Sequence, residues 1–241
     1  MHEHKQQHHR GRCKAPAKRP VSTHEATESN QVWCWDITWL PGPARGIHYY
    51  LYLILDIYSR KVVGWEIHEK ESSDNASKLV SKAHLREGVG SNPLVLHSDN
   101  GSPMKGASLL TTLYKLNVAS SYSRPRVSND NAYAESIFRT CKYRPENPYK
   151  GFSCIKDARA WVLKFVHWYN HEHKHSGIKF ISPAQRHAGN GSDIMKRREM
   201  VYAAAKAKHP ERWSGDTRNW ELPNSVFLNP EKEKIELTKT G

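Results

Sequence analysis

The chain has 241 residues and a formal net charge of +13, with 37 Lys and Arg against 24 Asp and Glu. This excess of basic side chains attracts polyanions, so nucleic acid is the leading expected partner. Because no stretch approaches the roughly 18 continuous apolar residues of a membrane span, and the start has no apolar signal-peptide run, we expect a cytoplasmic protein without a membrane partner.

Residues 1–30 predict a basic, polar arm or linker, because they carry few apolar side chains. Its histidines could be read as zinc ligands, but the only cysteine nearby is Cys13, and no second cysteine follows at metal spacing. A solvated tail is the favoured reading. The other cysteines are equally scattered, so neither a disulfide framework nor a cysteine-based zinc site is indicated.

Three strands follow the arm, each rich in aromatic and β-branched residues: Val32 to Trp39, Ile47 to Asp56, and Lys61 to His68. The connections between them are too short for a crossover helix. The three strands are therefore expected to form an antiparallel meander.

Helices and strands then alternate. The pattern predicts a helix over Asp74 to Glu87, a short buried strand over Leu94 to Leu96, a helix from Ser102 to Leu116, and a strand over Val118 to Tyr122. Ser102 is the expected N-cap of the second helix, with Pro103 in its first turn. Three strands followed by this alternation predict an α/β fold, with one mixed five-stranded sheet flanked by helices.

Helices dominate the remainder. One begins near Asn131, where Asp130 is a candidate cap, and a second runs from about Ile155 to His171 with an aromatic apolar face. A short helix follows Ser182, and then a basic helix near Asp193 to Lys208. We divide the chain into the arm at 1–30, a core at 31–188 and a basic C-terminal extension at 189–241, within which 210–241 carries no assignable fold.

Three carboxylates occupy positions that favour catalysis. Asp36 lies inside the first strand, Asp99 just past the fourth, and Glu135 in the helix after the last. Carboxylates from separate elements suit Mg²⁺, and two such ions can promote an in-line displacement at phosphorus. Acids in a strongly basic chain are thus predicted to form a two-metal site that cuts and joins DNA.

Basic side chains near these acids are candidates for DNA contact. Lys142 is two helical turns beyond Glu135 and is expected to contact phosphate, whereas Arg139 either does so or pairs with Glu135 at i+4. The loop over Ser123 to Asn129 contributes Arg124 and Arg126. Asn131 either orients DNA or metal-bound water, or forms a turn.

Two other motifs compete with this site. Asp56 opens the turn before Ser59 and Arg60, where Asp commonly bonds its own backbone, so we assign it a structural role. The run from His171 to His175 matches the H-E-x-x-H pattern of zinc proteases. That pattern requires one continuous helix, whereas this run is expected to be a frayed helix end.

Five motifs in order resemble the integrase catalytic core of bacterial insertion-sequence transposases, and most closely the downstream product, OrfB, of the IS-three family. The resemblance covers about Gln31 to Ala188, and its motifs are Trp35-Asp36-Ile37-Thr38, Asp56-Ile57-Tyr58-Ser59-Arg60, Leu96-His97-Ser98-Asp99-Asn100-Gly101, Asn129-Asp130-Asn131-Ala132-Tyr133-Ala134-Glu135-Ser136 and Trp168-Tyr169-Asn170. It implies a ribonuclease-H-like fold related to retroviral integrases.

The resemblance also implies a mechanism. Asp36 would bridge two Mg²⁺ ions, for which Mn²⁺ can substitute, while Asp99 binds one ion and Glu135 the other. In the family, water frees a 3′-hydroxyl at the element's end, and that hydroxyl attacks a second phosphodiester. The first product is typically a bridged or circular form of the element.

The resemblance further implies partners: the element's terminal repeats and target DNA in the bacterial nucleoid, and at least a dimer of the chain. Family members usually carry a helix-turn-helix region ahead of the core, where this chain has a polar arm. Either the chain is short at its start, or end recognition needs an upstream-frame helix-turn-helix product. The alternative function is a truncated or inactive DNA-binding fragment that regulates a full-length transposase.

Overall fold

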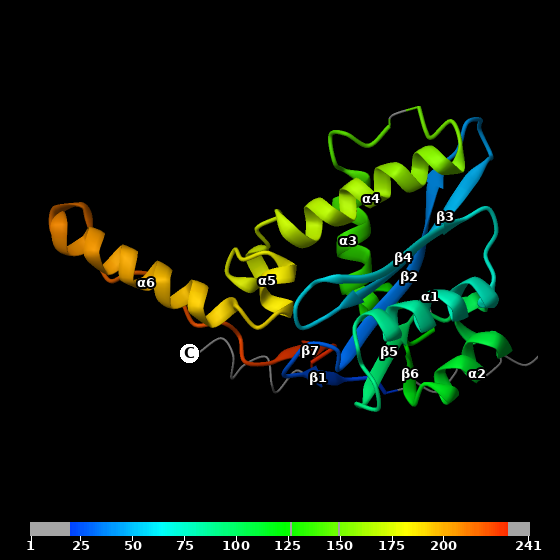
Figure 1. The fold of residues 1–241 in the computed structure, drawn as a ribbon, viewed down its shortest axis with the longest axis horizontal. Coiled ribbons are helices and arrows are strands. Elements are labelled where there is room, and N and C mark those ends of the chain that lie inside the picture. The colour runs from blue at the N-terminus through cyan, green and yellow to red at the C-terminus, as the bar shows by residue number, and fades with distance from the viewer. Residues whose placement is uncertain (1–19, 126, 149, 231–241) are drawn as a thin grey trace, which may run out of the picture.

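A computed structural model describes residues 20–125, 127–148 and 150–230, and its centre is a mixed five-stranded sheet (Figure 1). The strands in chain order are β2 (Val32–Pro41), β3 (His48–Asp56), β4 (Val62–His68), β5 (Leu94–Ser98) and β6 (Val118–Tyr122). Their spatial order is β4-β3-β2-β5-β6. The first three form the predicted antiparallel meander, and β5 and β6 add parallel to β2. The predicted mixed sheet is therefore confirmed.

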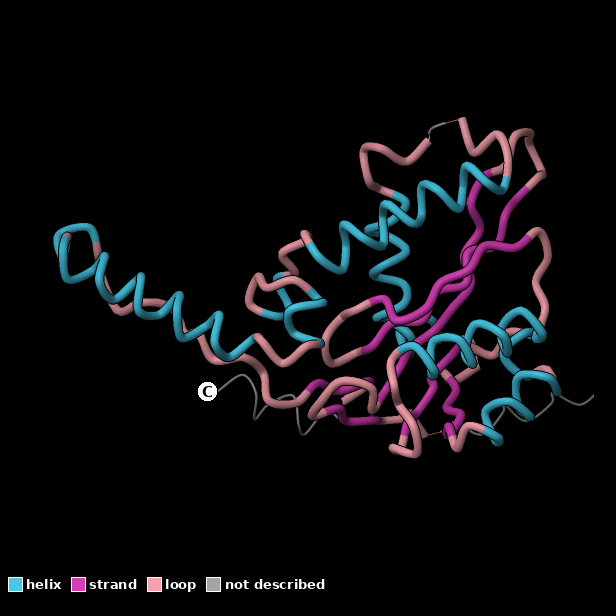
Figure 2. Tube along the Cα trace, in the orientation of Figure 1, coloured by secondary structure: helices cyan, strands magenta, loops and turns pink. Residues whose placement is uncertain are grey.

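Helices cover both faces of this sheet, as the tube in Figure 2 shows. One face carries α1 (Ser73–Arg86) and α2 (Ala107–Lys115), and the other carries α3 (Ala132–Lys142) and α4 (Ile155–His171). Alternate strand residues supply the two cores, because successive side chains point to opposite faces. Trp35 and Tyr52 pack toward α1 and α2, whereas Leu51 and Leu53 pack toward α3 and α4.

The predicted helix from Ser102 to Leu116 is wrong in one respect: the structure divides it. A short 3₁₀ helix, η1 (Ser102–Lys105), comes first, Gly106 is extended, and α2 begins at Ala107. The N-cap of η1 is Gly101, not Ser102. A Cβ on Gly106 would lie 2.2 Å from the Cβ of Ser73, so the close approach of α1 explains the break.

The ends of the described chain meet in a ribbon that the sequence did not reveal. β1 (His24–Ala26) pairs antiparallel with β7 (Val226–Leu228), at the lower edge of Figure 1. Ala26, Val226 and Leu228 are buried against Cys34 of β2. The described part of the predicted arm and the end of the extension therefore pack on the core, and the division at 30/31 and 188/189 stays a prediction.

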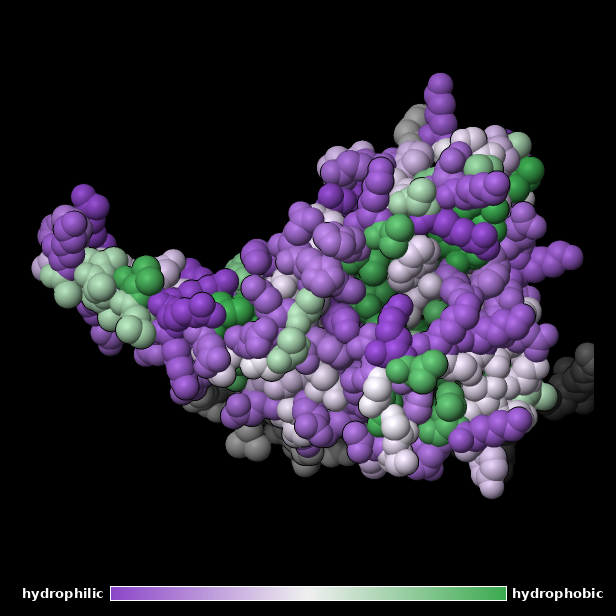
Figure 3. Space-filling model, viewed as in Figure 1, coloured by the Kyte–Doolittle hydropathy of each residue, from purple (hydrophilic) through white to green (hydrophobic). Residues whose placement is uncertain are grey.

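A series of helices after α4 links the core to β7. The chain passes from α4 through η3 (Ser176–Ile178) and α5 (Pro183–His187) into α6 (Gly191–Lys208), then through η4 (Pro210–Arg212) to β7. The predicted basic helix is thus present as α6, which projects from the body in Figure 1. Apolar side chains lie among polar ones on this projection in Figure 3, and Met200 and Val201 are 70% and 66% exposed. None of the helices in the described ranges has the length and apolar character needed to cross a membrane.

Substitution of Gly106 by Ala is expected to lower the free energy of unfolding by about 1–3 kcal/mol, the usual cost of overpacking. The added methyl group would overlap Ser73. Urea denaturation measures the change. Gly215→Ala is the matched control, because a Cβ there meets no atom within 4 Å. Equal midpoints for the two variants would contradict this account of the helix break.

Candidate active site

Parallel pairing of β2 with β5 brings the first two acids together. Cys34 is the register partner of His97, and each acid lies two residues further along its strand direction. Because neighbouring strands are about 4.8 Å apart and side chains alternate, Asp36 and Asp99 lie at one level and on one face. That face is the one under α3 and α4, because Asp36 pairs with Leu53 on β3.

The third acid is brought to this face by α3. Ala134, Ile137, Phe138 and Cys141 form the buried stripe of the helix. Glu135 lies beside that stripe and is partly exposed. Asn131 fixes the start of the helix, because its buried Nδ2 donates a hydrogen bond of 3.2 Å to the backbone carbonyl of Trp35, the residue before Asp36.

The charges of the three carboxylates act on one another. Burial raises the pKa of Asp36 to about 7, opposed by a hydrogen bond from the Ile37 amide and reinforced by the charges of Asp99 and Glu135. Burial and the charge of Asp99 likewise raise the pKa of Glu135. Mutual repulsion of this kind indicates one shared electrostatic site.

Residues around Asp99 hold it in place, and sequence reasoning missed the most direct of them. Ser123 Oγ donates to Asp99 Oδ1 at 2.7 Å, and the Ser123 amide donates to the carbonyl of Ser98. Asn100 Nδ2 donates to the carbonyl of Ser123 at 2.6 Å. The only sequence signal for Ser123 was its position directly after β6, in a polar stretch. Glu71, which precedes α1, was also missed, although its charge contributes to the raised pKa of Asp36.

The structure separates the predicted DNA contacts into two groups. Lys142 and Arg139 are exposed on α3, beyond Glu135. Arg124 is instead held by Asp130, whose carboxylate accepts from its backbone amide, Nε and Nη2 at 2.9 Å each. The guanidinium holds the pKa of Asp130 below its usual value.

One expectation for the turn before α3 changes accordingly. Asp130 binds Arg124 rather than capping the helix, whose N-cap residue Asn131 makes no capping hydrogen bond. The side chain of Asn131 is fully buried and donates to the carbonyl of Trp35, and its role toward DNA or metal-bound water stays a prediction. Arg126 lies outside the described residues.

The competing sites have structural explanations. Asp56 is fully buried and accepts hydrogen bonds from the Ser59 amide and hydroxyl and from the Asn30 amide, as expected for a turn residue. α4 ends at His171, and His175 accepts a hydrogen bond from Gly177. The histidine pattern therefore lacks the continuous helix that a zinc protease requires.

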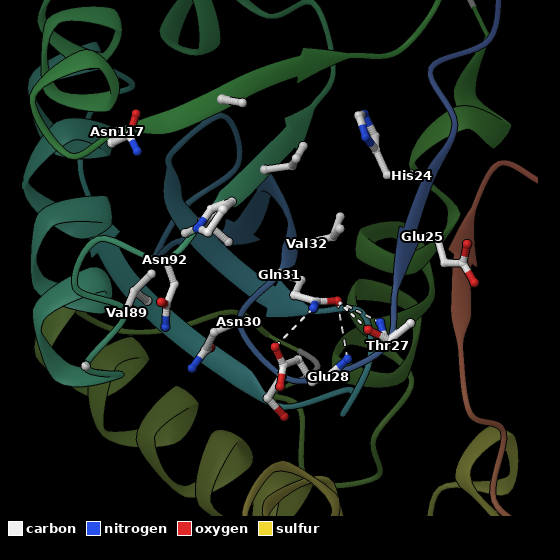
Figure 4. A pocket seen from close by; sticks show the side chains of 16 residues that line it. His24, Glu25, Thr27, Glu28, Asn30, Gln31, Val32, Val89, Asn92 and Asn117 are labelled. Carbon is white, nitrogen blue, oxygen red and sulfur yellow. Dashed lines mark hydrogen bonds between the residues drawn. The ribbon is translucent and has the colours of Figure 1, made fainter.

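A groove of about 790 Å³ lies at the opposite ends of β2 and β5, away from the acids (Figure 4). Its polar side chains bond mainly to one another: Gln31 Oε1 accepts from the Thr27 amide and hydroxyl, and Asn30 accepts from Trp33. These pairings hold Thr27, Asn30 and Gln31 in place without a ligand. The groove is thus a weaker candidate site than the three acids.

The acids suit a divalent cation in chemistry, because hard cations take carboxylate oxygens. The charge of such a cation would also cancel the repulsion that adds to burial in raising the pKa values of Asp36 and Glu135. Within the described ranges, no group of three or more His, Cys, Asp or Glu side chains is already placed to hold a metal ion. The three carboxylates would therefore have to approach one another to share cations.

Comparison with known proteins identifies the family. Two integrase core domain models match residues 26–128 and 116–183. The transposase for insertion sequence element IS904 of Lactococcus lactis is 32% identical over 182 residues, which are 73% of this chain and 69% of that protein. The chain belongs to the IS3 family of insertion-sequence transposases. The predicted resemblance is confirmed.

Other comparisons of this IS3-family chain agree. Transposase InsF of insertion sequence IS3A from Escherichia coli is 29% identical over 161 residues, and the match spans 66% of this chain but only 54% of InsF. A chain in the structure of the simian T-cell lymphotropic virus intasome, in complex with PP2A regulatory subunit B56 gamma, superposes with a TM-score of 0.53 at 17% identity, covering 70% of this chain and 59% of that one. The sheet and its flanking helices therefore form the expected ribonuclease-H-like fold.

The raised pKa of Asp36 predicts a pH-dependent stability. The folded state binds this proton more tightly than the unfolded state, so stability falls as the pH rises from about 4 to the folded pKa of about 7. The slope from this group is at most about 1.4 kcal/mol per pH unit. Asp36→Asn is expected to reduce this dependence of stability on pH, measured by urea denaturation with chelator present. Asp74→Asn, which neutralises an exposed acid on α1, is expected to leave the dependence unchanged. Equal slopes in wild type and Asp36→Asn would contradict the assignment.

Proposed function

We propose that the chain catalyses divalent-cation-dependent cleavage and strand transfer at the DNA ends of a mobile insertion element. The observation that supports this best is the meeting of Asp36, Asp99 and Glu135 on one face, from β2, the end of β5 and α3, in a family of transposases. Two Mg²⁺ ions, replaceable by Mn²⁺, would activate the attacking oxygen and stabilise the leaving oxygen at phosphorus when bound there.

The chain's own residues prepare this chemistry. By the family pattern, Asp36 would contact both cations, with Asp99 and Glu135 each contacting one. Ser123 holds Asp99 through its hydroxyl, and Asn131 holds the start of the Glu135 helix against β2. Burial of Asp36 strengthens its interaction with cations, because a desolvated carboxylate gains more from an opposite charge.

DNA would lie across the exposed side of α3. Lys142 and Arg139 are exposed there without a hydrogen-bonding acidic partner among the described residues, so both are available for phosphate. Arg124 supports this surface from the neighbouring loop while bound to Asp130. We include Arg126 by its sequence position alone.

The wider reaction follows the family pattern. Water would free a 3′-hydroxyl at the element's end, and this hydroxyl would attack a second phosphodiester to give a bridged or circular product. Two DNA ends require at least two copies of the chain. An upstream-frame helix-turn-helix product would supply recognition of the terminal repeats, and the reaction would take place on the bacterial nucleoid.

Removal of one site carboxylate tests the proposal directly. Asp99→Asn and Glu135→Gln are each expected to lower strand joining of element-end oligonucleotides in Mg²⁺ by more than about 100-fold, since changes even to the outer partners of metal ligands cost 10–100-fold. DNA retention in a filter assay should persist, because neither substitution removes a positive charge.

Glu211→Gln is the control, because it neutralises an exposed acid outside the sheet and its flanking helices. Joining by wild type and control alone supports the proposal. Joining that survives in Glu135→Gln would remove this residue from the site. DNA retention without joining in any variant, wild type included, would favour the alternative of a regulatory DNA-binding fragment.

Lys142→Ala is expected to weaken DNA binding similarly for all sequences. Loss of one phosphate contact should also reduce the slope of log affinity against log salt concentration by about 1. Fluorescence anisotropy across a salt series measures both effects. Lys78→Ala removes an equally exposed lysine from α1, on the opposite layer, and should leave the slope unchanged. Equal effects of the two variants would refute a specific contact at Lys142.

A further inference from the structure

The ribbon of β1 and β7 lies beside the active-site segment and is bonded to it. We call residues Ser22–Ala26 and Val226–Asn229 together the terminal ribbon. Thr23 Oγ1 donates to the carbonyl of Asn229 at 2.8 Å, which closes the ribbon at its end. The integrase core matches end at residue 183, so the β7 half of this ribbon lies outside them.

Two hydrogen bonds connect the β7 side of the ribbon to the segment that carries Glu135. Asn229 Nδ2 donates to the carbonyl of Asp130 at 2.9 Å. Tyr133 Oη donates to the carbonyl of Phe227 at 2.8 Å. Asp130 lies two residues before the start of α3 and Tyr133 is the second residue of the helix, so these bonds fix the helix start, three residues before Glu135.

A second connection starts from β1 and reaches the same carbonyl. His97 Nε2 lies 3.0 Å from the carbonyl oxygen of Asp130, which can only accept, so Nε2 carries the proton. His97 Nδ1 must then accept, and it does so from Ser121 Oγ at 2.9 Å. Ser121 Oγ in turn accepts from His24 Nε2 at 2.8 Å.

These bonds all end at the short segment between Asp99 and Glu135. Ser123, which holds Asp99, is at one end of it, and Asn131, which holds α3 against β2, is at the other. The carbonyl of Asp130 accepts from Asn229 of the ribbon and from His97 of β5, which Ser121 links to His24 on the β1 side. A shift of the ribbon would therefore move Glu135 relative to the two strand acids.

We propose that the terminal ribbon is a positioning element for the active site, in which Asn229 and Tyr133 hold the segment of residues 130–135 so that Glu135 faces Asp36 and Asp99. The proposal rests on the proposed function in that these acids are taken as the cation ligands. The C-terminal segment thereby determines how well the integrase core binds its cations, although it supplies none of the three carboxylates.

The test uses the full chain with Asn229→Gly, Tyr133→Phe and the double variant. Asn229 has a left-handed backbone with φ of 50°, so glycine removes the side chain without adding strain. Phenylalanine removes only the hydroxyl of Tyr133 and keeps the ring under Arg60. Asn117→Gly is the matched control, because Asn117 also has a left-handed φ, of 55°, but its side chain lines the groove at the ends of β2 and β5 opposite the acids.

Two measurements are made on each protein. Hydrogen–deuterium exchange by mass spectrometry should be about fivefold faster in peptides spanning residues 123–135 of Asn229→Gly, the effect of losing the one side-chain hydrogen bond from Asn229 to this segment. The other hydrogen bond that this variant loses, to the carbonyl of Ser22, lies within the ribbon. Mn²⁺ affinity, measured by electron paramagnetic resonance of the free ion, should fall about 10-fold in the double variant, as for other outer-shell partners. Asn117→Gly should match wild type in both.

Each result has a definite meaning. Faster exchange in residues 123–135 together with weaker Mn²⁺ binding supports the positioning role. Faster exchange with unchanged Mn²⁺ affinity overturns the positioning role, because the ribbon would then only stabilise the fold. Exchange in Asn229→Gly equal to that in Asn117→Gly also overturns it. Wild type that binds Mn²⁺ no better than Glu135→Gln would count against the proposed function instead, and exchange would still report on the ribbon.

Discussion

Hydrogen bonding between the parallel strands β2 and β5 is the constraint on which the rest of the site depends. Its register places Asp36 and Asp99 side by side, where their charges repel. This repulsion and the burial of Asp36 both favour the protonated form of Asp36, so the fold must hold the two charged groups in place at a cost in free energy. The hydrogen bonds from Ser123 to Asp99 and from Asn131 to Trp35 are what the chain uses to do so.

Much of the sequence that resembles the family serves this framework rather than the chemistry. Asn170 of α4 donates to the carbonyl of Val62 and accepts from its amide, so it joins α4 to the edge strand β4. Arg186 of α5 donates to the carbonyls of Tyr58 and Pro223. Because buried polar groups need partners, such residues tolerate few replacements even though they are remote from the acids.

The core is tied to the C-terminal segment of the chain through the terminal ribbon and through the helices from α5 to η4. Residues after α5 extend along α6, return past Trp220 and join β1 beside the Glu135 helix. Hydrogen bonds from Asn229 to the carbonyl of Asp130 and from Tyr133 to the carbonyl of Phe227 join this segment to the start of the Glu135 helix.

Local pattern was enough to predict much of this protein. Period-two alternation fixed the three meander strands, short links fixed their antiparallel order, and helical spacing located α1 and α4. The three acids could be proposed from their order and spacing in a strongly basic chain, with Asp36 inside a strand, Asp99 past a strand end and Glu135 in a helix. These signals are readable because they depend on residues close together in the sequence.

Tertiary structure decided what depends on distant partners. Gly106 breaks a helix because Ser73 packs against it, and Asp130 binds Arg124 instead of capping α3. The strand β7 has only three residues and exists through pairing with β1, about 200 residues earlier in the chain. The sequence by itself thus determined the sheet, most helices and the candidate acids, while long-range packing determined how the chain ends hold those acids in place.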